Sequence, residues 1–209
     1  FKKTHVAGLV FAGTITKTRI FFDIRPDLRA LALWKKMKGH LDDKILRALA
    51  RELEMEGMRV LSYTWLLSDL LFPKGVLTRR APSEEEENDI VFGLELARQI
   101  GRLDIGQCIV VQDGSVLAVE AIEGTDETIK RGGRLGGPGS VVIKICKPTQ
   151  DTRFDLPAIG TKTIEAMIEA GAKVLAAEAG KSLFFDRRDA VELADKHGIA
   201  IIGVEPENT

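Results

Sequence analysis

The chain has 209 residues, 44% hydrophobic and 29% charged, so it can bury a substantial core as one large domain or two small ones. Its 30 Lys and Arg nearly balance its 31 Asp and Glu, which leaves no global basic field to attract nucleic acid. No apolar run reaches the ~20 residues that a membrane-spanning helix needs, so we expect a globular protein without a transmembrane segment.

The first residues do not look like the natural start of a protein. Residue 1 is Phe, and residues 1–13 read as the end of a helix followed by a strand over residues 4–11, with no earlier strand to pair with. The charged start, apolar middle and small-residue cleavage site of a signal peptide are not recognisable. We therefore expect an N-terminally incomplete protein.

The N-terminal part alternates between helix and strand signals. Pro26 suits the first turn of a helix over residues 27–38, and Asp42 can cap a second helix, which Gly57 ends. A strand over residues 59–64 follows, and then a loop punctuated by Pro and Gly over residues 68–82. We place a domain boundary near Pro82, so that residues 1–82 form an N-terminal domain with its linker and residues 83–209 form a C-terminal domain.

The C-terminal part begins with a helix that Ser83 can cap, and its acidic first turn, residues 84–87, complements the helix dipole. Strands over residues 107–112 and 115–119 are joined at Asp113-Gly114, a strong hairpin signal. The remaining predicted elements are a strand over 140–146, a helix over 161–170, a strand over 174–177, a helix over 187–197 and a strand over 199–204. This order predicts a mixed-sheet α/β domain.

The cysteines and histidines offer little chemistry. Cys108 and Cys146 each lie in an apolar, strand-like run, so we interpret them as buried free thiols, which fits a reducing cytoplasm. His5, His40 and His197 stand far apart and show no His-x-x-x-His spacing, which disfavours a zinc site or a histidine-based triad. We expect any reaction to depend on carboxylates.

Carboxylates concentrate in two segments that each follow a strand-like run. Residues 118–139 and 147–160 hold six of them: Glu120, Glu123, Asp126, Glu127, Asp151 and Asp155. Together they would give the hard oxygen ligands that Mg²⁺ or Mn²⁺ prefers. Between them, RGGRLGGPG offers glycine amides and two arginines to a phosphate. A flexible loop beside a solvated acidic face is an equally open alternative.

Long strings along the chain carry a family resemblance. They are RPDLRAL, DDKILRALARELEMEGMRVL, PKGVLTRRAP, GRLDIGQCIVVQDGSVLAVEAIEGTDETIKRGG, KPTQDTRFDLPAIGTKTIEAM, VLAAEAGKSLFFDR and ADKHGIAIIGV, and they cover almost all of the sequence. Together they resemble the UDP-2,3-diacylglucosamine pyrophosphatase family of lipid A biosynthesis that lacks the metallophosphoesterase fold.

The resemblance implies both a fold and an activity. The fold is α/β, with a Rossmann-like N-terminal domain, incomplete in this chain, and an α/β C-terminal catalytic domain. The activity is Mg²⁺-dependent hydrolysis of UDP-2,3-diacylglucosamine to UMP and 2,3-diacylglucosamine 1-phosphate, in the cytoplasm of Gram-negative bacteria.

The family motifs map onto single residues. Asp151 of the KPxQDxRxDxP motif is the first candidate for the essential acid, followed by Asp126 of the EGTD motif and by Asp155, and the same three are the candidate ligands of Mg²⁺, or of Mn²⁺ in its place. The candidate substrate-binding residues are Glu123, Gly124, Thr125, Arg131, Arg134, Lys147, Gln150 and Arg153. Where the family usually reads AGKV, residues 12–15 read AGTI, so the charge of that lysine is missing.

The expected partners are an acylated UDP-sugar, a second copy of the chain in a homodimer and, peripherally, the cytoplasmic face of the inner membrane. An apolar run is the candidate surface for the acyl chains, unless it belongs to the N-terminal core: Trp65, Leu66, Leu67, Leu70, Leu71 and Phe72. A non-catalytic binding module for a nucleotide or acyl sugar would need the basic, Gly-rich segment but not the acids. A nucleotide-dependent oxidoreductase would need a G-x-G-x-x-G turn, which the sequence lacks.

Overall fold

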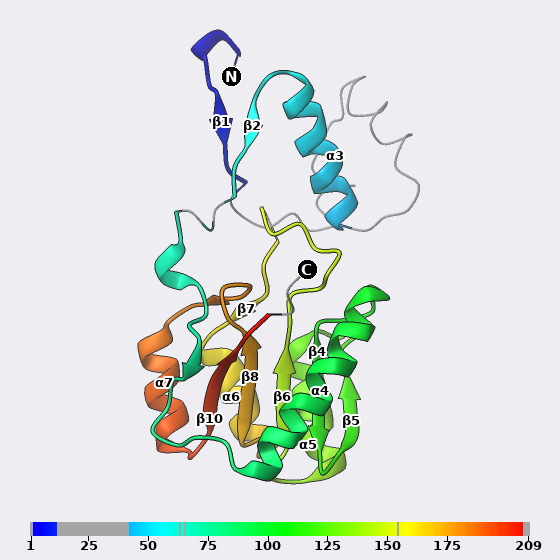
Figure 1. Cartoon of the computed structure of the whole chain (residues 1–209), viewed down its shortest axis with the longest axis vertical. Helices are drawn as coiled ribbons and strands as arrows, with labels where there is room; N and C mark the ends of the chain where they lie inside the picture. The colour runs from blue at the N-terminus through cyan, green and yellow to red at the C-terminus, as the bar shows by residue number, and fades with distance from the viewer. Residues whose placement is uncertain (1, 12–41, 63, 65, 154, 207–209) are drawn as a thin grey trace. The chain divides into compact units, whose positions relative to one another are not determined.

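The structure is a computed structural model that describes residues 2–11, 42–62, 64, 66–153 and 155–206 (Figure 1). It contains two compact units. The first unit comprises Phe1–Leu67 and Asp151–Asp155, and the second comprises Ser68–Gln150 and Leu156–Thr209. The helix predicted over residues 27–38 and the AGTI segment lie outside the described residues.

The first unit contains a short parallel strand pair and one helix. Strand β1, Gly8–Leu9, pairs with β2, Arg59–Val60, and helix α3, Asp42–Met55, precedes β2. The helix predicted from Asp42 is confirmed, and Gly57 follows its end with a positive φ of 85°, a conformation that glycine adopts without steric cost. Both strands are shorter than the predicted strands over residues 4–11 and 59–64. An apolar run in the sequence does not indicate how many of its residues form hydrogen bonds with a neighbouring strand. The Rossmann-like character of this domain stays a prediction.

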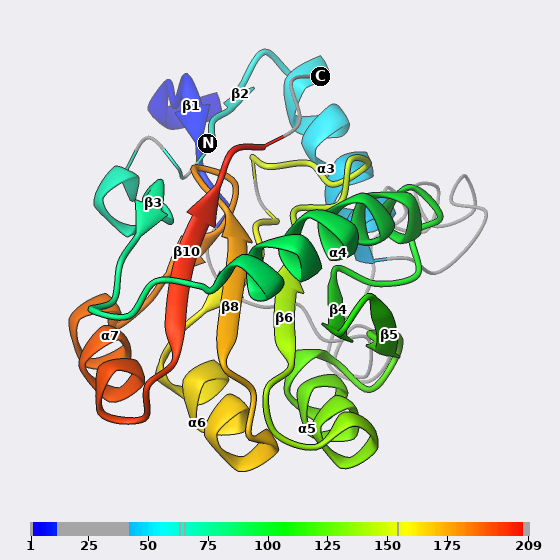
Figure 2. The same ribbon diagram turned by 60° about the horizontal axis from the view of Figure 1, so that its bottom comes forward.

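The second unit is built on a six-stranded mixed sheet, which confirms the predicted mixed α/β class (Figure 2). Across the sheet the strands are β3 (Gly75–Val76), β10 (Ala200–Val204), β8 (Val174–Glu178), β6 (Val141–Lys144), β4 (Cys108–Gln112) and β5 (Ser115–Val119). Strands β6, β8 and β10 are parallel, whereas β4 is antiparallel to both β5 and β6. Therefore β5 and β6 run in the same direction and end at the same edge.

Helices cover both faces of this sheet (Figure 2). Helix α4, Glu84–Arg102, packs on one face, and three helices pack on the other: α5 (Thr125–Gly136), α6 (Thr161–Ala170) and α7 (Arg187–Lys196). Successive strand residues point to opposite faces, so Ile143 packs in the core with α4 while Val142 packs in the core with α5 and α6. A second, two-stranded sheet pairs β7, Ala158–Ile159, with β9, Leu183–Phe184.

Local signals located several of these elements correctly. Ser83 and Glu86 form a capping box at the start of α4, and Asp113 and Gly114 form the β4–β5 turn with φ values of 51° and 68°. The predicted helices over 161–170 and 187–197 correspond to α6 and α7. Both cysteines are buried free thiols, and burial raises the pKa of the Cys108 thiol to about 12.

The flexible-loop alternative for the glycine-rich segment RGGRLGGPG is wrong for residues 131–136, which belong to a helix. Residues 125–136 form α5, whose glycines permit close packing. A Cβ atom on Gly132 would lie 2.6 Å from Val110 Cγ1, and one on Gly133 would lie 2.3 Å from the carbonyl oxygen of Ala170. Glycine lowers intrinsic helix stability, and the close contacts with β4 and α6 compensate for that cost.

We expect Gly133→Ala to destabilise the protein. Overpacking against the Ala170 backbone should cost about 1–3 kcal/mol, which exceeds the gain of roughly 1 kcal/mol from the better helix propensity of alanine. Urea unfolding measures the change. Leu135→Ala is the matched control, because this side chain on the same helix is 67% exposed. A Gly133→Ala variant as stable as the Leu135→Ala variant would contradict the packing argument.

Among the residues that the structure describes, no helix combines the length and the apolar character required to cross a bilayer.

Candidate functional site

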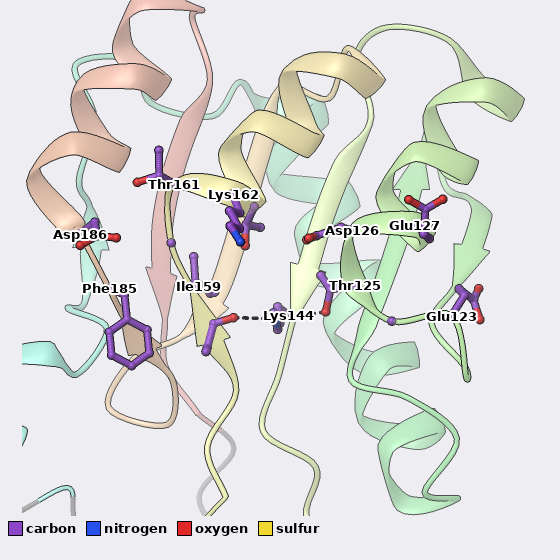
Figure 3. Close-up of a pocket in the computed structure, with 14 residues that line it drawn as sticks. Glu123, Thr125, Asp126, Glu127, Lys144, Ile159, Thr161, Lys162, Phe185 and Asp186 are labelled. Atoms are coloured by element: carbon purple, nitrogen blue, oxygen red, sulfur yellow. Dashed lines mark hydrogen bonds between the residues drawn. The ribbon is translucent and has the colours of Figure 1, made fainter. Parts of the chain in front are cut away.

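A pocket of about 660 Å³ lies in the second unit, beyond the ends of β5 and β6. Four segments line it: residues 123–127, Lys144, residues 158–163 and residues 185–186 (Figure 3). Ligands of α/β sheets commonly bind outside the carboxyl ends of the strands, and the volume lies in the range usual for small-molecule sites. The pocket is therefore the candidate site of this unit.

Lys144 is the buried cation of this pocket. It is the last residue of β6, and its side chain points to the α5 and α6 side of the sheet, as does that of Val142. The residue is 5% exposed, and its Nζ donates to Thr125 Oγ1 at 3.0 Å and to the Ala158 carbonyl at 2.8 Å (Figure 3). Among the described residues, no carboxylate forms an ion pair with it. The buried carboxylate of Glu120 is separated from Lys144 Nζ by one hydroxyl oxygen, that of Thr125.

Glu120 and Thr125 hold this lysine in position. The buried Glu120 accepts the backbone N–H of Gln107 at 3.2 Å and the Thr125 hydroxyl at 3.0 Å. Because the hydroxyl proton points to Glu120, the oxygen of Thr125 has lone pairs available for Lys144. The relay orients Nζ and leaves the ammonium group beside the pocket.

The first turns of α5 and α6 also face the pocket. Their N-cap residues, Gly124 and Gly160, provide no side-chain hydrogen bond to the first-turn amides. Gly124 has φ 84° and ψ 172°, a conformation that is essentially restricted to glycine. Amides at a helix start lack intrahelical acceptors and carry the positive end of the helix dipole, so this arrangement favours an anion.

Acidic side chains line the same pocket. Glu123 pairs with Arg131 at 2.5 Å, and this contact lowers the pKa of Glu123 below its ordinary value. The side chains of Asp126 and Asp186 are exposed. Proteins usually hold Mg²⁺ with one or two carboxylates, substrate phosphates and water, so this donor set suits the ion chemically. The described residues contain no group of three His, Cys, Asp or Glu placed to hold a metal ion.

Asp151 lies in the first unit, in a close ion pair with Arg153. Arg153 Nε and Nη2 donate to the two carboxylate oxygens of Asp151 at 3.0 and 2.8 Å, and its Nη1 lies 2.7 Å from Glu54 Oε1. The Arg153 guanidinium holds the pKa of Asp151 below its ordinary value. Asp151 is therefore ionised at neutral pH.

The structure gathers only part of the predicted set. Glu123, Gly124, Thr125 and Asp126 lie at the pocket of the second unit, whereas Asp151 and Asp155 belong to the first unit. The proposed metal ligands Asp126, Asp151 and Asp155 are thus divided between the units, and their joint role stays a prediction.

Several predicted phosphate contacts already have partners. Lys147 Nζ lies 2.6 Å from Asp104, Arg131 pairs with Glu123, and the Gln150 side chain accepts the Lys147 backbone N–H at 3.1 Å. Arg134 is exposed in the last turn of α5. Sequence reasoning missed Lys144 and Lys162, although a lone lysine in the apolar run VVIKIC was a usable signal.

The apolar run predicted to receive acyl chains contains a core residue. Phe72 is 1% exposed and stacks on Phe184 in the core of the second unit, with ring centroids 4.8 Å apart. Its assignment to an acyl surface is therefore wrong. Leu66 is 58% exposed, and Trp65 lies outside the described residues.

Comparison with known proteins matches both parts of the chain to one family. Residues 1–70 match the LpxI N-terminal domain, and residues 73–202 match the LpxI C-terminal domain. The chain is also 38% identical, over 223 residues, to the UDP-2,3-diacylglucosamine pyrophosphatase LpxI of Caulobacter vibrioides, an alignment that covers 99% of this chain and 79% of that protein.

Proposed function

The chain belongs to the LpxI family, and from this premise we propose that it hydrolyses the diphosphate of UDP-2,3-diacylglucosamine to UMP and 2,3-diacylglucosamine 1-phosphate in lipid A synthesis. The observation that carries the proposal on the structural side is the pocket of the second unit. It offers a buried lysine, two helix starts and exposed carboxylates to one ligand. A diphosphate is an anion that such donors suit.

In the proposed reaction, water attacks one phosphorus and the phosphoanhydride bond breaks. The oxygen of the water forms the new P–O bond, the released phosphate keeps the bridging oxygen, and the two protons of the water are passed to phosphate oxygens or solvent. Positive groups aimed at the phosphoryl oxygens stabilise the charge that develops in the transition state. Lys144 and the first-turn amides of α5 and α6 would fill this role.

The acids have two proposed tasks. Asp126, with Asp151 and Asp155, would hold Mg²⁺, or Mn²⁺ in its place, which when bound offsets the charge of the diphosphate and makes phosphorus a better electrophile. Because its pKa is lowered by Arg153, Asp151 is a weak proton acceptor. We propose that the ionised Asp151 helps to hold Mg²⁺ and orients the attacking water, and that Arg153 keeps the Asp151 side chain in position.

The proposed contacts of the other predicted residues follow from their partners. Arg131 would act mainly through Glu123, and Lys147 and Gln150 through the segment that leads to Asp151. Arg134 is exposed in the last turn of α5, at the opposite end of this helix from the pocket, so its predicted phosphate contact gains no support from the pocket. The acylated substrate places the reaction at the cytoplasmic face of the inner membrane in this proposal.

Release of UMP tests the function directly. We expect the chain, supplied with Mg²⁺ and UDP-2,3-diacylglucosamine in detergent micelles, to release UMP and the acylated sugar phosphate in equal amounts. Chromatography with mass detection measures both products. The matched control substrate is the same UDP-sugar without acyl chains, which should react more slowly. Substrate binding without UMP release would contradict the proposal and favour a binding module.

A further inference from the structure

We infer that Phe185 is a stacking platform for the uracil base, so that the UMP half of the substrate, and not the acylated sugar, occupies the pocket of the second unit. The inference rests on the proposed function for the identity of the substrate. It goes beyond that function in naming a specificity-determining residue and the half of the substrate that this residue recognises.

Phe184 and Phe185 are adjacent in the chain but have different surroundings. Phe184, the last residue of β9, is fully buried and stacks on Phe72 in the core. Successive residues of an extended segment face opposite ways, and Phe185 is 41% exposed and lines the pocket (Figure 3). Among the described residues that line the pocket, it alone is aromatic. A ligand that covers this apolar ring is favoured, because it removes apolar surface from water.

The backbone fixes Phe185 beside the start of α6. Its N–H donates to the Ile159 carbonyl at 2.8 Å, which continues the parallel pairing of β7 with β9. A Cβ atom on Gly160, the N-cap residue of α6, would lie 3.6 Å from Phe185 Cβ. In a nucleotide the ribose joins the base to the phosphate. An aromatic residue next to the helix start that is proposed to receive a phosphoryl group therefore matches the layout of a nucleoside monophosphate.

The charges of the pocket disfavour the other half of the substrate. Asp126, Lys162 and Asp186 line the pocket and are exposed. The sugar carries two acyl chains, and hydrocarbon packed over charged groups would remove them from water at a high cost. A nucleobase combines a flat face that stacks on an aromatic ring with a polar edge. Uracil can therefore cover Phe185 while its edge stays among polar groups.

Removal of the base from the ligand is the first test. UMP and ribose 5-phosphate share the sugar and the phosphate, so their dissociation constants for the full chain, measured by calorimetry with Mg²⁺, isolate the contribution of the base. We expect UMP to bind about fivefold more tightly or better, the low end of the range for one stacked base. Glucosamine 1-phosphate should bind no better than ribose 5-phosphate. Equal affinities for UMP and ribose 5-phosphate, or tighter binding of glucosamine 1-phosphate than of UMP, would overturn the inference.

The variant Phe185→Leu tests where the base binds, because it removes the ring and keeps an apolar side chain. We expect UMP binding to weaken by about fivefold or more and ribose 5-phosphate binding by less than about twofold. Phe185→Tyr keeps the ring and should retain the UMP affinity. Val91→Ala is the control, since Val91 is 70% exposed on α4 and does not line the pocket.

Two results with a folded Phe185→Leu variant would overturn the role of the ring. One is the wild-type affinity for UMP, and the other is an equal loss of affinity for UMP and ribose 5-phosphate, which would indicate a structural role only. If the leucine variant does not fold, the comparison of the two ligands on the wild-type chain decides.

Steady-state kinetics separates this inference from the proposed function. A contact to the base is remote from the reacting phosphorus and is made equally in the ground state and the transition state, so Phe185→Leu should raise KM and leave kcat within about threefold. Hydrolysis of UDP-2,3-diacylglucosamine with the same KM in variant and wild type would keep the function and overturn the platform. UMP binding that depends on Phe185, without UMP release from the substrate, would keep the platform and contradict the function.

Discussion

Asp151→Asn should lower the rate of UDP-2,3-diacylglucosamine hydrolysis by about 10²-fold or more, the order of loss typical when a contact that stabilises the transition state is removed. The substitution preserves the shape of the side chain and removes its negative charge. The fold should persist, because Arg153 keeps its contact with Glu54 at 2.7 Å. Steady-state release of UMP measures the change, and circular dichroism checks the fold.

Glu54→Gln is the matched control for Asp151→Asn. It breaks the other ion pair of the same arginine, a contact in which the Glu54 side chain is 40% exposed and which should contribute only about 0–1 kcal/mol. We expect this variant to keep most of the wild-type rate. An Asp151→Asn variant that retained more than a tenth of wild-type turnover would remove Asp151 from the proposed mechanism.

The ion pair also sets a pH dependence. The pKa of Asp151 lies below its ordinary value of 3.8, with the hydrogen bonds from Arg153 as the main cause. The folded protein therefore gains stability from this ionised carboxylate above pH 3.8 and loses that gain as the pH falls through the lower, folded pKa. Arg153→Gln should move the acid limb of the activity profile toward higher pH. An acid limb at the same pH in both proteins would show that Asp151 does not determine it.

Removal of divalent cations should abolish hydrolysis. The expected ligands are all oxygen atoms, and the pocket residue Asp126 is exposed to a metal–phosphate complex. Excess EDTA should bring UMP release to background, Mg²⁺ or Mn²⁺ should restore it, and zinc-selective chelators should have no effect. The thermal midpoint measured with and without EDTA is the control for folding. Full activity in excess EDTA would refute the metal requirement.

Asp126→Asn refines the metal prediction. If Asp126 holds the ion, the variant should need a higher Mg²⁺ concentration for half-maximal rate than the wild type does. Asp104→Asn is a comparable control, because Asp104 pairs with Lys147 and does not line the pocket. The same Mg²⁺ requirement in Asp126→Asn and wild type would exclude Asp126 as a ligand.

The sequence by itself determined the features that depend on a few neighbouring residues or on long motifs. Ser83 and Glu86 lie three residues apart and cap one helix, and Asp113-Gly114 contains the two left-handed residues of one hairpin turn. Such signals are complete within a short segment. The long motif strings likewise indicated the family, which the domain matches confirm.

Only the tertiary structure decided which of these residues meet and what charge surrounds them. Lys144 reads as one polar residue in an apolar strand, and its role at the pocket depends on Thr125 and Ala158, which reach it from separate segments. The glycine-rich sequence of α5 is typical of a loop, and its helical structure is explained by the close packing of Gly132 against Val110 and of Gly133 against Ala170. Electrostatic environment and close packing are properties of groups brought together across the fold, so spacing along the chain does not determine them.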